Sequence, residues 1–173
     1  PGSIGGAVKM NAGCFGFETK DFLREVQIID HKINLKRITN KELDFQYRNS
    51  NLPSGSIIIS SIFDYKYGNK NEINELINEI KIQREKTQPL KVKTSGSTFK
   101  NPKDNFAAKL IEDSGCKGLQ VGDAYVSEKH SNFIINSNKA NATQIEELGK
   151  RIIEKVYNKF DIKLEWEIKI IGD

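Results

Sequence analysis

The stretch TSGSTFKNP, residues 94–102, places Ser97 directly after a glycine. Glycine, serine, asparagine and proline favour turns, so this stretch is predicted to be a loop that presents Ser97. Neither His31 nor His130 lies in the G-x-S-x-G setting of a hydrolase nucleophile, and a Ser-His-Asp triad is not indicated. A serine hydroxyl can donate a proton without such a base, although most Gly-Ser pairs are only turns.

Charged side chains give two further candidates. Arg48 lies between Tyr47 and Asn49, and its planar guanidinium could bind a carboxylate through two hydrogen bonds. A surface arginine in a turn is the alternative. Glu165 and Glu167 fall on the same face of a predicted strand, where two solvated carboxylates at a sheet edge are the simpler interpretation.

The opening segment, residues 1–18, is rich in glycine and lacks both the helical and the strand period, so an irregular backbone is predicted. Residues without Cβ let a backbone approach a phosphate or a flat ring closely. The segment does not contain the G-x-G-x-x-G fingerprint or a Walker loop. Tight-turn structure and ligand contact both stay open for its glycines, which are Gly2, Gly5, Gly6, Gly13 and Gly16.

Composition indicates a folded chain with a mixed surface. The 173 residues are 37% hydrophobic, which suits one ordinary domain or two small ones. The net charge is +4, but 22 of the 27 basic residues are lysines interspersed with acidic ones, so a nucleic-acid partner is not indicated. Cys14 and Cys116 lack the spacing of a metal site, and no metal is expected. The sequence has no long apolar run and no signal-peptide pattern, and a cytoplasmic location is predicted.

Strand patterns dominate the first part of the chain. Residues 24–30 and 33–38 alternate around a polar turn and predict a hairpin, and residues 56–68 predict a third strand, apolar enough to be central. Residues 69–89 predict an amphipathic helix that Pro89 ends. The apolar face of that helix is formed by Ile73, Leu76, Ile77 and Ile80.

Both periods occur in the second part. Helices are predicted from an Asp/Asn cap at 104–105 to Gly115, and from 141 to 160 behind a cap. Short strands are predicted at 132–137 and 163–171, the second alternating apolar and charged residues. Helical and strand patterns that are not regularly interleaved indicate an α+β fold. A domain boundary is predicted within residues 88–94.

Five segments together resemble the ordered motif set of the UDP-N-acetylenolpyruvoylglucosamine reductase family, over Pro1 to Gly172. They are PGSIGGAVKMNAGCFG, YRNS, GSTFKNP, AAKLIEDSGCKGLQVGDAYVSEKHSNFIIN and LEWEIKIIG. The resemblance implies the second lobe of a vanillyl-alcohol-oxidase-type FAD-binding fold, followed by an α+β substrate domain. Residues 1–90 would be part of the FAD-binding domain. Residues 91–173 would be the substrate-binding C-terminal domain, with the last strand returning toward the active site.

The resemblance also implies residue roles. Arg48, Ser97 and Glu167 match the family's catalytic positions, and Tyr47 and Asn101 match positions that bind substrate. Arg48 would neutralise charge at the substrate carboxylate, Glu167 would polarise it, and Ser97 would give a proton to carbon. The residues implied to contact FAD are Gly2, Ser3, Ile4, Gly5, Gly6, Asn11 and Gly13.

The implied reaction belongs to peptidoglycan precursor synthesis, and so to cell-wall biogenesis, cell shape and cell division. NADPH reduces FAD, and the reduced flavin passes hydride to UDP-N-acetylglucosamine enolpyruvate, which becomes UDP-N-acetylmuramate. Two alternatives stay open: another FAD-dependent oxidoreductase of the same fold, which would not need the catalytic trio, and a non-catalytic basic binding module. No membrane partner is expected.

The resemblance further implies the family's shorter second type, because no tyrosine-bearing insertion separates residues 56–68 from the following helix. Members of the family carry a further N-terminal lobe with its own phosphate-binding loop for FAD, and Pro1 falls inside a motif that follows that lobe. The expectation is therefore a C-terminal part of a longer reductase. Alone, it would retain FAD weakly and would be inactive, with the missing lobe as its partner.

Overall fold

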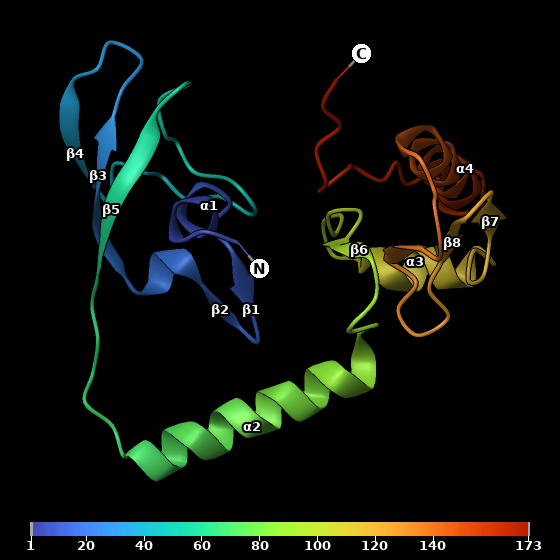
Figure 1. The fold of residues 1–173 in the computed structure, drawn as a ribbon, viewed down its shortest axis with the longest axis horizontal. Coiled ribbons are helices and arrows are strands. Elements are labelled where there is room, and N and C mark those ends of the chain that lie inside the picture. Colours follow the sequence, from blue (N-terminus) through green and yellow to red (C-terminus); the bar gives the residue numbers. More distant parts are fainter. Residues whose placement is uncertain (1, 173) are drawn as a thin grey trace. The chain divides into compact units, whose positions relative to one another are not determined.

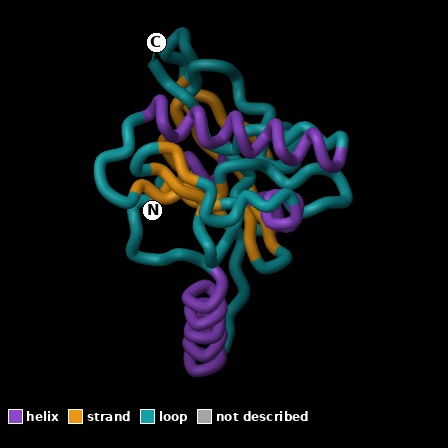
Figure 2. Tube along the Cα trace, turned by 90° about the vertical axis from the view of Figure 1, so that its right-hand side faces the viewer, coloured by secondary structure: helices purple, strands orange, loops and turns teal. Residues whose placement is uncertain are grey.

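The computed structural model describes residues 2–172, and the chain divides between Asn69 and Lys70 into two compact units (Figure 1). Each unit combines helices with antiparallel strands, so the predicted α+β fold is confirmed (Figure 2). The predicted division into a FAD-binding and a substrate-binding domain near residue 90 is a statement about function and stays a prediction. No helix within residues 2–172 is long and apolar enough to cross a membrane.

The first unit begins with a short helix, α1 (Ile4–Lys9), where an irregular backbone was predicted. That prediction is wrong because Ser3 caps the helix: its Oγ accepts the N–H of Gly6 at 3.0 Å, which satisfies one of the donors that a helix start leaves open. Strands β1 (Gly13–Cys14) and β2 (Phe17–Glu18) follow as a small antiparallel pair.

A three-stranded antiparallel sheet forms most of the rest of this unit, after the 3-10 turn η1 (Thr19–Asp21). Strands β3 (Leu23–Ile29) and β4 (Leu35–Thr39) form the predicted hairpin. The Asp30 carboxylate closes its turn by accepting two backbone N–H groups at 2.9 Å.

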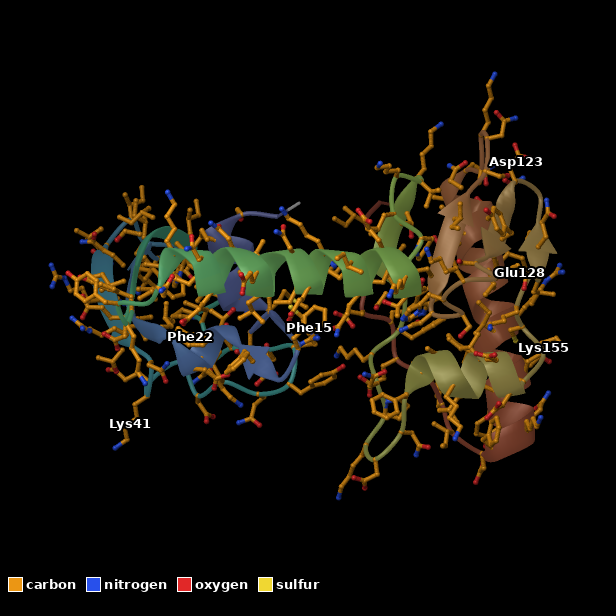
Figure 3. All side chains as sticks on the ribbon, turned by 90° about the horizontal axis from the view of Figure 1, so that it is seen from below. Phe15, Phe22, Lys41, Asp123, Glu128 and Lys155 are labelled. Carbon is orange, nitrogen blue, oxygen red and sulfur yellow. The ribbon has the colours of Figure 1, made fainter. Side chains whose placement is uncertain are left out.

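The third strand, β5 (Ile57–Phe63), pairs only with β3 among the described residues, so the sheet order is β4-β3-β5. The prediction that this strand is central is therefore wrong, and Ile57 is 66% exposed. One face of the sheet covers a small core made of Val8, Leu23, Val26, Ile28, Leu43 and Leu52. Phe15 and Phe22 lie outside this core and are exposed (Figure 3).

The second unit starts with helix α2 (Lys70–Thr87), which confirms the predicted helix. No residue of α2 is buried, and Leu76 of its apolar face is 57% exposed. A four-stranded antiparallel sheet then has the order β6-β9-β8-β7. Its strands are β6 (Thr94–Ser97), β7 (Gln120–Val121), β8 (Ala124–Val126) and β9 (Phe133–Asn136).

Two helices complete the second unit: α3 (Ala107–Asp113) and α4 (Ala142–Phe160). Asn141 caps α4 as predicted, accepting the N–H of Gln144 at 2.9 Å. The Asp/Asn cap predicted for α3 is wrong, since the cap residue is Phe106 and the amide oxygen of Asn101 accepts the N–H of Ala107 instead, at 3.0 Å. Both helices contribute to the core of this unit, whose buried members include Phe99, Leu110, Ile111, Val126, Leu148, Ile152, Val156 and Leu164.

The last predicted strand, residues 163–171, is not a regular strand. Within residues 2–172 it forms one isolated bridge, between Trp166 and Phe99, and its backbone hydrogen bonds join it to the short segment 98–100. The rings of Phe99 and Trp166 lie 4.9 Å apart between centroids. Trp166 also lies against α4 at Gly149, where an added Cβ would be 1.9 Å from its Cη2 atom.

Gly149→Ala should therefore destabilise the protein. Displacing Trp166 from a packed contact costs about 1–3 kcal/mol, which exceeds the gain of about 1 kcal/mol from replacing glycine in a helix. Urea unfolding measures this change, and the fluorescence of Trp166, the single tryptophan, should shift to longer wavelength. Lys150→Ala, on the exposed side of the same helix, is the control. Equal stability of the two variants would contradict the assigned packing.

Candidate functional site

In the first unit, Arg48 lies in a tight turn. The N–H of Asn49 donates to the carbonyl of Gln46 at 3.2 Å, and the N–H of Gln46 donates to the carbonyl of Asn49 at 3.1 Å. Arg48 has a φ of +54°, which is uncommon for a residue with a side chain. A backbone outlier of this kind costs about 1–3 kcal/mol. The turn therefore presents Arg48 at a cost in stability.

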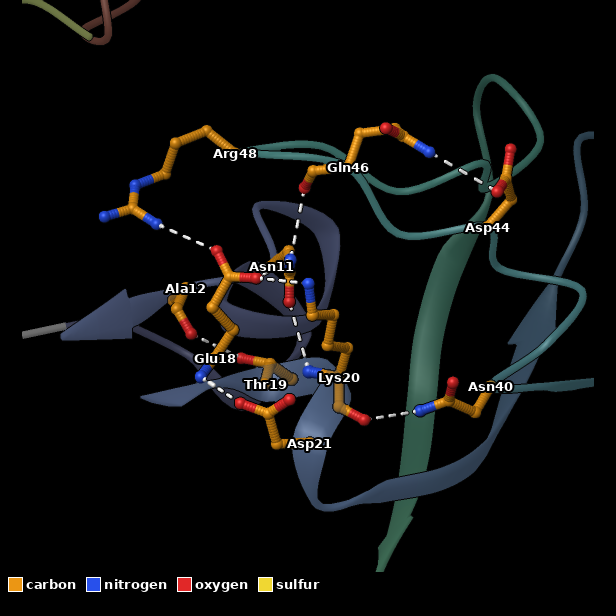
Figure 4. Close-up of polar contacts among 10 residues, drawn as sticks. All are labelled: Asn11, Ala12, Glu18, Thr19, Lys20, Asp21, Asn40, Asp44, Gln46 and Arg48. Atoms are coloured by element: carbon orange, nitrogen blue, oxygen red, sulfur yellow. Dashed lines mark hydrogen bonds and ion pairs between the residues drawn. The ribbon is translucent and has the colours of Figure 1, made fainter. Parts of the chain in front are cut away.

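The guanidinium of Arg48 is held on several sides. One nitrogen, Nη2, donates to the carbonyl of Gly13 at 3.1 Å. The other, Nη1, lies 3.9 Å from a carboxylate oxygen of Glu18, a contact that Figure 4 shows. The ring of Tyr47 lies 4.8 Å below the guanidinium carbon, within the range of a cation–π interaction. Gly13, Tyr47 and Arg48 line a common cleft of about 460 Å³. The fold thus brings three predicted site residues together.

Asn11 and Glu18 support this turn from beneath. The Asn11 amide nitrogen donates to Glu18 at 3.0 Å and to the carbonyl of Gln46 at 3.1 Å, and its oxygen accepts the N–H of Lys20 at 3.1 Å (Figure 4). Asn11 is fully buried. Its side chain therefore joins the glycine-rich segment to the Arg48 turn.

Glu18 and Lys20 were not predicted as site residues. Lys20 forms an ion pair with Glu18 at 2.8 Å, and this hydrogen-bonded carboxylate raises the pKa of Lys20. A single sequence carries no signal for this role, because Glu-Thr-Lys reads as ordinary solvated surface. The contact with Arg48 appears only when the two segments meet in space.

A second cleft of the first unit collects other predicted residues. Ser3, Gly5 and Gly6 line a cleft of about 550 Å³ together with Lys9 and the segment 52–58. The ammonium of Lys9 donates to the carbonyl of Ser50 at 3.1 Å. Gly2 and Ile4, both exposed, line neither cleft. The seven residues predicted to contact FAD are thus divided among two clefts, the buried Asn11 and the surface.

In the second unit, the segments that carry Ser97 and Glu167 lie side by side. The N–H of Glu167 donates to the carbonyl of Thr98 at 2.9 Å, and the N–H of Lys100 donates to the carbonyl of Glu165 at 2.9 Å. Ser97 and Glu167 are both half-buried. Glu165 is exposed and pairs with Lys100 at 3.4 Å. Glu167, which the family resemblance singled out, is therefore the less exposed of the two carboxylates.

The prediction that residues 94–102 form a loop is wrong for residues 94–97, which pair with β9 as strand β6, so Ser97 is the last residue of a strand. Residues 96–101, which we call the Ser97 loop, are shaped by Gly96 and Asn101. Gly96 has a φ of +90°, a conformation that favours glycine, immediately before Ser97. Asn101 is exposed, and its side chain caps α3 through Ala107. Its predicted contact with substrate stays a prediction.

The loop from Ser127 to Asn132 is a buried polar feature that sequence reasoning missed. The Ser127 hydroxyl accepts the N–H groups of Lys129 at 3.1 Å and His130 at 3.3 Å. His130 accepts the N–H of Asn132 at Nδ1, at 3.3 Å, and its ring lies 4.6 Å from that of Phe133. This arrangement is typical of a histidine with a structural role.

Stability should depend on the protonation of His130. Burial, and more weakly the nearby charge of Lys117, lower the pKa of His130 below its ordinary value near 6.5. The unfolded chain then binds a proton more readily than the folded one. The contribution to stability is complete above about pH 6.5 and is lost as pH falls through the folded pKa.

His130→Gln should therefore flatten the loss of stability between pH 7.5 and pH 5, as measured by urea unfolding. The matched variant His31→Gln, at an exposed turn, measures how much the other histidine contributes to the pH dependence of stability. An unchanged pH dependence in His130→Gln would contradict the assignment.

Residues 88–171 match the family model described as UDP-N-acetylenolpyruvoylglucosamine reductase, C-terminal domain. A protein named UDP-N-acetylenolpyruvoylglucosamine reductase from Rickettsia bellii is 45% identical over 172 residues, which is 99% of this chain and 57% of the relative. A protein of the same name from Gluconobacter oxydans is 44% identical, over 99% of this chain and 56% of the relative.

A solved structure agrees with these matches. The crystal structure of UDP-N-acetylenolpyruvylglucosamine reductase (MurB) from Thermus caldophilus has a TM-score of 0.83 and 40% identity, and the match covers 95% of this chain and 59% of that one. The chain therefore spans somewhat more than half the length of these relatives.

Within residues 2–172, no three His, Cys, Asp or Glu side chains gather as a metal site would require.

Proposed function

The chain belongs to the UDP-N-acetylenolpyruvoylglucosamine reductase family, and we propose that it supplies the catalytic groups of that reductase. The reaction is the NADPH-dependent reduction of UDP-N-acetylglucosamine enolpyruvate to UDP-N-acetylmuramate, in peptidoglycan precursor synthesis. The observation that carries the proposal is the backbone pairing of the segment after Ser97 with the segment around Glu167, because the two segments that carry these candidate residues lie side by side. The activity belongs to a protein of full family length, since the chain spans 57% of its relative from Rickettsia bellii.

The residues of the first unit fit a flavin. Ser3, Gly5 and Gly6 give the 550 Å³ cleft a backbone-rich wall, which suits a phosphate or a flat ring, and Lys9 adds a positive charge. We propose that residues 1–90 form part of an FAD-binding domain of the vanillyl-alcohol-oxidase type. Residues 91–173 would bind the substrate, which agrees with the family-model match beginning at residue 88. When bound, FAD would carry the hydride chemistry between NADPH and the enolpyruvyl group.

The catalytic roles follow from the chemistry of the side chains. The Arg48 guanidinium can bind the substrate carboxylate and neutralise negative charge that develops there, with the Tyr47 ring keeping it in place. Glu167 orients and polarises that carboxyl group. Ser97 donates its hydroxyl proton to the adjacent carbon, which completes the addition of hydrogen across the double bond. Asn101 contributes to substrate binding from the same loop as Ser97.

The most direct alternative is another FAD-dependent oxidoreductase of the same fold. Such an enzyme would need the glycine-lined cleft but not Arg48, Ser97 and Glu167. The matches extend over both units, and this favours the reductase. Because the reaction consumes NADPH and a nucleotide sugar, we place it in the cytoplasm, with roles in cell-wall biogenesis, cell shape and cell division.

A spectroscopic cycle tests the function in a protein of full family length that contains these residues. The yellow protein should bleach with NADPH and regain its colour with UDP-N-acetylglucosamine enolpyruvate. Bleaching without recovery would refute the reductase reaction and would favour the other oxidoreductase. A colourless protein that binds nucleic acid with steep salt dependence would favour the basic binding module.

Ser97→Ala should leave the reduction of flavin by NADPH nearly intact and slow its reoxidation by substrate. Removing a positioned proton donor typically costs about 10²–10⁴-fold in rate. Stopped-flow absorbance separates the two half-reactions. Ser95→Ala, at an exposed serine of the same strand, is the control. Equal losses in both half-reactions of Ser97→Ala would contradict the role as proton donor.

The 173-residue chain alone should retain FAD weakly and show no turnover. We propose that the flavin cleft of the first unit is completed by the further FAD-binding lobe of the family. Visible absorption after desalting measures retention, and NADPH consumption with the enolpyruvyl substrate measures activity. Turnover by the purified 173-residue chain would overturn this requirement for the lobe.

A further inference from the structure

The side chain of Asn132 is bound to both backbone groups of one residue in the Ser97 loop. Its amide nitrogen donates to the carbonyl of Phe99 at 2.8 Å, and its amide oxygen accepts the N–H of Phe99 at 3.0 Å. The backbone carbonyl of Asn132 also accepts the N–H of Thr98, at 2.8 Å. Asn132 and Phe99 are both buried. Three hydrogen bonds from one residue thus fix the two positions that follow Ser97.

This contact continues the sheet by means of a side chain. Strands β6 and β9 pair until Ser97 lies opposite Phe133. Beyond that pair, the carboxamide of Asn132 provides the donor and the acceptor that a neighbouring strand would otherwise provide. The backbone of Thr98 and Lys100 bonds to Glu167 and Glu165. Segment 98–100 is therefore held by Asn132 as well as by the segment that carries Glu167.

Hydrogen bonds within the loop from Ser127 to Asn132 hold Asn132 in place. Its N–H donates to Nδ1 of His130 at 3.3 Å, and the N–H of His130 donates to the hydroxyl of Ser127 at 3.3 Å. Ser127, Ser131 and Asn132 are all buried. The carboxamide is therefore presented by a loop whose polar groups are largely paired before any ligand binds.

We propose that Asn132 is a positioning residue that sets the place of the Ser97 hydroxyl relative to Glu167. Ser97 is the last residue of β6 and lies opposite Phe133, and Asn132 then fixes the two residues that follow Ser97. A displacement of about 1 Å in a reacting group can cost on the order of 100-fold in rate. This inference rests on the proposed reductase function, because Ser97 is a proton donor only in that reaction.

The chain contains a closely matched control in Asn136, four residues further along. The amide nitrogen of Asn136 donates to the carbonyl of Ala140 at 2.9 Å, and its oxygen accepts the N–H of Ala140 at 3.0 Å. This is the same pair of hydrogen bonds, made by the same residue type. It holds the segment that leads into α4 and not the Ser97 loop.

The experiment compares Asn132→Ala with Asn136→Ala in a protein of full family length that contains these residues. We expect Asn132→Ala to slow reoxidation of the flavin by the enolpyruvyl substrate about 10- to 100-fold and to leave its reduction by NADPH within about twofold of wild type. Asn136→Ala should leave both half-reactions near wild type. Amide hydrogen exchange should become faster at Phe99 in the first variant and at Ala140 in the second.

Asn132→Asp provides a second test that does not depend on the alanine variant folding. An ionised carboxylate accepts the N–H of Phe99 but cannot donate to its carbonyl, whereas a protonated carboxyl group can do both. Burial raises the pKa of such a group. The reoxidation rate of Asn132→Asp, divided by the wild-type rate at each pH, should therefore recover as pH is lowered.

Several outcomes would overturn the inference. Equal slowing of reoxidation in the Asn132 and Asn136 variants would show a general effect of lost stability. Faster exchange at Phe99 with unchanged reoxidation would show that the clamp does not position Ser97, as would a pH-independent ratio for Asn132→Asp. Failure of the wild-type protein to be reoxidised by the substrate would refute the proposed function itself, and this arm uses no variant.

Discussion

The backbone of residues 98–100 is buried between segments that are not regular strands, and its polar groups must still be paired. An unpaired buried N–H or C=O costs about 1–3 kcal/mol, so this short segment could not be stable without partners. The hydrogen-bond partners of this segment are Asn132, which directly precedes β9, and the chain around Trp166. The side-by-side course of the segments that carry Ser97 and Glu167 is a consequence of that pairing.

In the first unit, too, an asparagine side chain pairs with a backbone group of a loop that carries a candidate site residue. The Arg48 turn is closed by hydrogen bonds between Gln46 and Asn49, and the buried carboxamide of Asn11 donates to the carbonyl of Gln46. An asparagine carboxamide has donors and an acceptor at a fixed separation, so it can replace a peptide group where no strand is available. Both units therefore hold their candidate catalytic loops with buried asparagines.

Local sequence patterns correctly predicted the helices and strands that are determined by their own residues. The β3–β4 hairpin, α2, and α4 with its Asn141 cap follow from periodicity and capping residues within each segment. The position of β5 in its sheet and the irregular course of residues 163–171 depend on which segments are available as partners, and that information lies elsewhere in the chain. The α3 cap is provided by Asn101, five residues before the helix cap, which is outside the usual capping positions.

The same distinction applies to the candidate site. Arg48, Ser97 and Glu167 could be named because their motifs match a family. Glu18 lies outside the matching motifs, and Asn132 lies inside one that implied no role for it, so both are found through their contacts. Sequence patterns identify groups that would meet a ligand more readily than the buried groups that hold them. Supporting residues of this kind are revealed by hydrogen bonds between distant segments.

Because Gly149 and Trp166 are in contact, the residue at each of these positions limits which residues the other position can accept. The indole occupies the space that any side chain at position 149 would need. A larger residue at position 149 becomes acceptable only after the ring at position 166 has been replaced by a smaller one. During divergence, replacement of Trp166 by a smaller residue should therefore precede any gain of a side chain at position 149, because the fold disfavours the combination of both side chains.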